Sequence, residues 1–198
     1  TFFNDSDVYK IIEGTANSLQ NHPDPELEAY TDRVIDLIAG AQWDDGYLFT
    51  FYSLPERRPE ARWSNVGSMH ELYCAGHLIE AAIAYERATG KRKLLDVAIR
   101  FADLICDTFG PSGRGDAPGH QEIELALFRL YDVTGEKRYL ATARFFIDQR
   151  GKKDRLRRYG TYSQDHKRFV EQENGVGHSV RAGYLYCAAT DIARLEHD

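Results

Sequence analysis

Apolar residues recur at intervals of three and four along most of the chain, which is the spacing of α-helices. Start signals support this prediction. Pro25 stands in the first turn of one predicted helix, whose apolar stripe runs through Leu27, Val34, Leu37 and Ile38. The pattern predicts seven helices, over residues 5–20, 25–42, 70–90, 91–110, 119–135, 136–151 and 177–191.

Part of this pattern repeats and predicts a recurring helical hairpin. Residues 76–90 align without a gap with residues 177–191, each beginning with Gly-His, and residues 119–135 are the same unit with a short insertion. A second helix follows the first two units, over 91–110 and 136–151. Each hairpin therefore turns at Thr-Gly.

The two helices of a hairpin differ in their surfaces. The first is apolar or small on most sides, as from Leu72 to Ile83, so it must be buried, whereas the second carries charges such as Lys93 and Asp96 over much of its surface. Alternating buried and surface helices build an open solenoid or, if curvature closes them, a toroid. We expect an all-α fold, an incomplete α/α toroid that is part of an (α/α)6 barrel. Residues 1–198 would then be a partial barrel domain, truncated at both ends, with no second domain.

The segment "MHELYCAGH", residues 69–77, raises the question of a metal site. In a helix it places His70, Cys74 and His77 along one stripe. A zinc protease helix needs His-Glu-x-x-His, and here Cys74 takes the place of the second histidine. A zinc site would need a further ligand from elsewhere, and a small buried hydrophobe is the alternative role for Cys74. We favour no metal site and leave His77 a structural role.

Three histidines occupy related places in the repeat. His120 and His178 each follow a glycine at the start of a predicted buried helix, and His70 lies in the first turn of another. Such side chains should point to the same mouth of the barrel. A helix N-terminus disfavours positive charge, so the imidazoles would be neutral, each with one donor and one acceptor. We predict that they bind a ligand made of hydroxyls; the alternative is that they only cap helices or pack.

Carboxylates and aromatic residues add to this candidate site. Glu124 follows His120 by one helical turn, so we predict that it faces the cavity, while Glu122 projects from nearly the opposite side. A pair of carboxyls for glycoside hydrolysis cannot be chosen, so the catalytic residues stay unknown. The irregular stretch 43–68 holds six aromatic residues, of which we predict that Trp63 faces the ligand and the others form a small core.

Composition narrows the range of partners. The formal net charge of −6 argues against nucleic acid, and no apolar run is long enough to cross a bilayer. We interpret the basic run 150–160 as a solvated loop rather than a phosphate-binding patch. The three cysteines, Cys74, Cys106 and Cys187, show no CxxC spacing, which favours reduced thiols and a cytoplasmic location.

Longer stretches of the chain resemble family 127 of the glycoside hydrolases, the β-L-arabinofuranosidases, and its close relatives. They include "RWSNV", "HELYCAGHLIEAAIAYERATGKRKLLDVAIRFADLI", "PGHQEIELALFRLYDVTGEKRYLATARFFIDQRG" and "VGHSVRAGYLY", and the resemblance covers nearly the whole chain. It implies an α/α-barrel catalytic domain followed by β-sandwich domains. It also implies removal of terminal β-L-arabinofuranose, from a small sugar or an arabinose-containing glycan, with retention of configuration.

The same resemblance suggests roles for residues. Histidines of the family's "HELY", "GHQEIE" and "GHxVR" motifs line the sugar pocket and match His70, His120 and His178. The family's implied nucleophile is a zinc-bound cysteine thiolate, with a glutamate as acid/base, and no motif of this chain matches either. We therefore expect no cofactor within this chain, zinc in the full-length family member, and a fragment that carries part of the pocket but is inactive alone. The remainder of the barrel or another copy would be its partner, and the alternative is a non-catalytic carbohydrate-binding or helical scaffold module.

Overall fold

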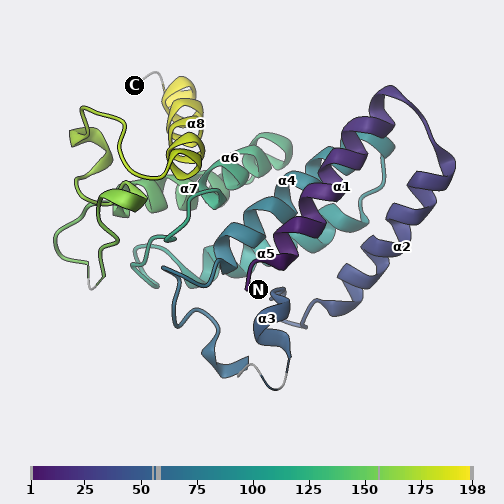
Figure 1. Cartoon of the computed structure of the whole chain (residues 1–198), viewed down its shortest axis with the longest axis horizontal. Helices are drawn as coiled ribbons and strands as arrows, with labels where there is room; N and C mark the ends of the chain where they lie inside the picture. The colour runs from purple at the N-terminus through teal and green to yellow at the C-terminus, as the bar shows by residue number, and fades with distance from the viewer. Residues whose placement is uncertain (1, 55, 57–58, 156, 197–198) are drawn as a thin grey trace.

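The computed structural model describes residues 2–54, 56, 59–155 and 157–196 and shows a protein built from helices (Figure 1). Within these ranges the chain has no β-strand beyond two isolated bridges. All seven predicted helices are present, and a short helix, α3 (Thr50–Ser53), is added. The seven are α1 (Asn4–Asn21), α2 (Pro25–Ala41), α4 (Glu71–Thr89), α5 (Lys93–Thr108), α6 (Ile123–Thr134), α7 (Lys137–Gln149) and α8 (Ser179–Glu196).

These helices form two layers. The inner layer contains α1, α4, α6 and α8, each in contact with the next, and the outer layer contains α2, α5 and α7 (Figure 1). Each outer helix follows an inner one, so α1–α2, α4–α5 and α6–α7 are successive hairpins. All inner helices consequently run in the same direction, and their N-terminal ends lie at one end of the layer. The hairpin repeat and the all-α class are confirmed.

Burial follows the predicted difference between the two layers. Helix α4 lies between α1 and α6 and over α5, and its Leu72, Ile79 and Ile83 are buried together with a series of alanines. Outer helix α5 buries only one stripe, from Leu94 to Ile105. None of the described helices combines the length and the apolar character needed to cross a bilayer.

The hairpin turns use glycine as predicted. Gly90 and Gly135 follow the last residues of α4 and α6 and both adopt φ +74°. Glycine reaches this left-handed conformation without a Cβ clash, and its N–H closes the helix end by donating to a carbonyl four residues earlier. The Thr-Gly pairs therefore end the inner helices α4 and α6, after which the chain continues into the outer layer.

Two expectations about surfaces were wrong in part. Leu37, assigned to the apolar stripe of α2, is 75% exposed, because α2 rests on its neighbours along a narrow line that buries Thr31 and Ile35. The basic run 150–160 is not wholly solvated, because Arg150 is fully buried and Arg155 forms an ion pair with Asp165 at 2.8 Å. Each guanidinium group donates to a buried carboxylate, Arg150 to Glu124 and Arg155 to Asp165, and the local sequence does not reveal these pairs.

Candidate functional site

The three predicted histidines lie together at the N-terminal end of the inner layer. His70 immediately precedes α4, His120 lies three residues before α6, and His178 immediately precedes α8. The imidazole of His120 is 5.5 Å from that of His70 and 6.0 Å from that of His178, between ring centroids. The predicted convergence of rings from successive repeats is confirmed; their role in binding stays a prediction.

Aromatic side chains surround these rings. Tyr73, one turn into α4, lies 4.3 Å from His120, and Tyr184 of α8 lies 6.1 Å from the same ring. Lys10 of α1 donates a hydrogen bond of 2.7 Å to the Tyr73 hydroxyl. Tyr73 and Tyr184 were not predicted as site residues, although Tyr73 follows His70 by three residues in the same motif. We call His70, Tyr73, His120, His178 and Tyr184 the histidine cluster.

Hydrogen bonds fix which nitrogen of each ring carries the proton. Nδ1 of His70 lies 2.7 Å from the Ser68 carbonyl, and Nδ1 of His120 lies 2.6 Å from the Gln121 carbonyl. A carbonyl only accepts, so both Nδ1 atoms donate and both Nε2 atoms are acceptors. His178 differs, because its Nδ1 accepts from the Arg181 backbone N–H at 3.4 Å, which leaves Nε2–H as a donor. The three imidazoles therefore offer two acceptors and one donor.

Burial keeps two of these rings neutral. It lowers the pKa of His70, and it lowers the pKa of His120 to about 3, with the Arg181 guanidinium adding to the effect at both. The predicted neutrality is right for these two rings, but the main cause is desolvation rather than the position before a helix. Neutral rings keep an acceptor nitrogen at neutral pH, which a protonated ring lacks.

Two arginines hold the segments that carry the histidines. Arg181 donates to the Gly119 carbonyl at 2.7 Å and to the Ser163 hydroxyl at 2.6 Å. Arg150 donates to the carbonyls of Pro118 at 2.8 Å and Ser163 at 3.2 Å. The segment before α6 is thereby tied to the loop before α8.

The prediction that Glu124 faces the cavity was wrong. Its side chain is fully buried, with one oxygen accepting from Arg150 at 2.9 Å and the other from the Glu122 backbone N–H at 3.1 Å. Helical spacing does not relate these two side chains, because α6 begins at Ile123 and His120 lies outside the helix. A four-residue separation aligns two side chains only when both belong to the same helix.

The prediction that Trp63 faces a ligand was also wrong. Its φ of 62° turns the backbone N–H to the Glu71 carboxylate, at 2.9 Å, and its indole packs 5.3 Å from both Tyr47 and Phe109. Trp63 is 6% exposed and belongs to the aromatic core under the 43–68 segment. Burial raises the pKa of Glu71 to about 7, against the opposing hydrogen bonds from Tyr47 and Trp63.

The stripe His70–Cys74–His77 does not form a metal site. Among the described residues, no group of three or more His, Cys, Asp and Glu side chains is placed to hold a metal ion. Cys74 is fully buried and its Sγ lies 4.0 Å from the Phe3 carbonyl. Burial raises the pKa of this thiol, as expected of a cysteine that packs as a small hydrophobe.

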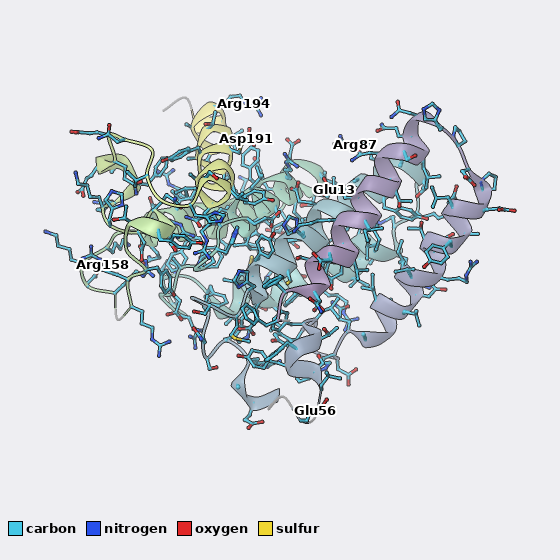
Figure 2. The ribbon with its side chains drawn as sticks, viewed as in Figure 1. Glu13, Glu56, Arg87, Arg158, Asp191 and Arg194 are labelled. Carbon is cyan, nitrogen blue, oxygen red and sulfur yellow. The ribbon has the colours of Figure 1, made fainter. Side chains whose placement is uncertain are left out.

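A hollow lies away from the histidine cluster. It has a volume of about 380 Å³ and is lined by residues of all four inner helices, including Glu13, Arg87, Asp191 and Arg194. Figure 2 labels these four charged side chains: Arg87, Asp191 and Arg194 belong to the C-terminal halves of α4 and α8, whereas Glu13 lies near the middle of α1. Charged side chains of both signs line this hollow.

Inner and outer helical layers, with a polar cluster at the N-terminal end of the inner layer, define this chain as part of an α/α barrel. The family described as "Beta-L-arabinofuranosidase, GH127 catalytic domain" matches residues 1–198. The chain belongs to this family of glycoside hydrolases.

Individual relatives agree with this assignment. The chain is 43% identical over 222 residues to a non-reducing end β-L-arabinofuranosidase of Bifidobacterium longum subsp. longum, covering 99% of the chain and 33% of the relative. It superposes with a TM-score of 0.93 and 45% identity on a GH127 β-L-arabinofuranosidase from Geobacillus stearothermophilus T6, covering 100% of the chain and 34% of that structure. A second GH127 β-arabinofuranosidase structure gives a TM-score of 0.91 and 47% identity over 99% of the chain and 32% of its own. The chain thus spans about a third of these relatives' length, and the predicted incomplete α/α toroid is confirmed.

Proposed function

We propose that this chain supplies one wall of the sugar pocket of a retaining β-L-arabinofuranosidase that acts on terminal β-L-arabinofuranosides. The observation that carries the proposal is the histidine cluster, in which rings from three segments lie within 6.0 Å of their neighbours and present two acceptors and one donor. Family membership and the names of the relatives supply the substrate class.

The cluster suits a small neutral sugar for a physical reason. Each sugar hydroxyl both donates and accepts, so the Nε2 atoms of His70 and His120 accept from hydroxyls and Nε2–H of His178 donates to an oxygen. The aromatic faces of Tyr73 and Tyr184 contact the C–H side of the ring, which is a common device of ligand pockets. Together these groups bind and orient the arabinofuranose.

We assign this chain binding and orientation rather than bond cleavage. The resemblance noted above implies a zinc-bound thiolate and a glutamate in motifs that this chain does not match. The described residues supply no ligand set for zinc. We expect the 198-residue chain alone to bind the sugar without hydrolysing it, and its cytoplasmic location stays a prediction.

Nuclear magnetic resonance of the isotopically labelled chain tests the proposal. Long-range ¹H–¹⁵N spectra report the ring nitrogens of each histidine, and methyl β-L-arabinofuranoside serves as ligand. We expect the signals of His70, His120 and His178 to shift and saturate together, while the exposed His22 does not move. Replacing His120 by alanine should weaken binding about tenfold, the effect of losing one or two hydrogen bonds, and His22→Ala should leave it unchanged. Cluster signals that stay fixed at saturating sugar would refute the proposal.

A further inference from the structure

A fourth histidine lies directly behind the histidine cluster. His77 follows Tyr73 by one turn of α4, and its ring lies 4.5 Å from that of Tyr73 and 5.9 Å from that of Tyr184, edge to face in both cases. His77 thus contacts two members of the cluster from within the inner layer. From the sequence, His77 was expected to have a structural role.

The two ring nitrogens of His77 are buried without a hydrogen-bond partner among the described residues. The residue is 4% exposed. Buried polar groups in folded proteins almost always have a partner in the protein or in ordered water. If His77 only filled space, an apolar ring of the same size could replace it without loss of stability.

A buried carboxyl lies close to His77. Oε1 of Glu122 lies 3.7 Å from Nδ1 of His77, the side chain is 1% exposed, and Oε2 has no partner among the described residues. A Cβ on Gly76 would stand 1.3 Å from that Oε2. Helix α4 therefore has glycine, an unfavourable residue inside a helix, where the carboxyl of Glu122 enters between α4 and α6.

Both members of this pair are uncharged. Burial raises the pKa of Glu122 well above its usual value, with Glu80 and Glu124 adding to the effect. Burial lowers the pKa of His77 to about 3, with Lys10 and His120 contributing. A protonated carboxyl is a donor and Nδ1 of a neutral histidine is its acceptor, which leaves Nε2–H of His77 free to donate. A movement of about 1 Å brings the two atoms to hydrogen-bond distance.

We propose that His77 is a fourth imidazole of the sugar site, donating through Nε2–H to a ligand oxygen or to a water that the ligand binds, and that Glu122 is its positioning residue. This inference rests on the proposed function, because the ligand is the same arabinofuranoside. It adds a second donor to the two acceptors and one donor of the other three imidazoles.

The titration with methyl β-L-arabinofuranoside separates the inference from the proposed function. We expect the Nε2 signal of His77 to shift and to saturate with the same dissociation constant as those of His70, His120 and His178. If those three shift and His77 does not, the inference is overturned and the proposed function stands. If none of them shifts, the proposed function fails and the inference fails with it.

Variants distinguish binding from mere packing. His77→Phe keeps an aromatic ring of similar size and should weaken sugar binding about tenfold, whereas binding equal to that of the unmodified chain would overturn the inference. Glu122→Gln keeps a neutral donor and should preserve the Nδ1-acceptor tautomer of His77, which ring ¹⁵N shifts report directly. Glu122→Leu removes the donor and should change that tautomer signature and weaken binding. A His77 tautomer identical in Glu122→Leu and in the unmodified chain would also overturn the positioning role.

Discussion

The buried ion pair between Arg150 and Glu124 gives a quantitative test of how the segments around His120 are held. Both side chains are at most 1% exposed, and the guanidinium also donates to the carbonyls of Pro118 and Ser163. Replacing Arg150 by methionine keeps much of the side-chain volume but leaves the Glu124 carboxylate buried without its cation. Breaking a buried pair from one side typically costs about 3–5 kcal/mol.

Urea unfolding followed by circular dichroism measures this cost. We expect Arg150→Met to lower the free energy of unfolding by about 3–5 kcal/mol, a large part of the stability of a typical domain. The double variant Arg150→Met/Glu124→Gln should lose clearly less than the sum of the two single variants, because it removes the stranded charge.

A matched control uses an exposed ion pair. Arg194 is 76% exposed and lies 4.0 Å from Asp191, so Arg194→Met should change stability by no more than about 0.5 kcal/mol. If Arg150→Met loses no more than this control, or if the double variant equals the sum of the single ones, the assignment of Arg150 and Glu124 as a coupled buried pair is refuted.

Three further predictions concern stability. The pKa of His120 is lowered in the folded chain, so the unfolded chain protonates this histidine first as the pH falls. The free energy of unfolding should therefore decrease between pH 6.5 and pH 3 by up to about 1.4 kcal/mol per pH unit. Urea unfolding at pH 7 and pH 5 should show a smaller decrease for His120→Asn. Gly76→Ala should lower the free energy of unfolding by about 1–3 kcal/mol, because the new Cβ meets the buried carboxyl of Glu122. Gly14→Ala, whose Cβ would have no atom within 4 Å, should raise it by up to about 1 kcal/mol. Equal effects of the two variants in urea unfolding would contradict this prediction. Tyr47→Phe removes the 2.6 Å hydrogen bond to Glu71, whose pKa is raised to about 7, so the loss of about 1–3 kcal/mol should be larger at pH 8, where the carboxylate is ionised, than at pH 5. A loss independent of pH would show that this bond does not favour the ionised form.

Local sequence was sufficient for the helices and for the gathering of the histidines. Hydrophobic spacing follows from the helix itself, and Thr-Gly ends a helix through a short-range backbone conformation. Equivalent positions in a repeated hairpin occupy equivalent places in space. The proximity of His70, His120 and His178 could therefore be predicted without knowledge of contacts between distant segments.

Tertiary structure decided which polar side chains face the site and which lie in the core. Glu124 and Trp63 were both predicted to face the cavity, yet Arg150 and the Tyr47–Phe109 aromatic core bury them. The reverse holds for His77, whose place beside Glu122 depends on how closely α4 and α6 pack at Gly76. Periodicity fixes the face of a single helix, but the partner that a buried charge or ring meets comes from a segment far away in the chain, and only packing selects it.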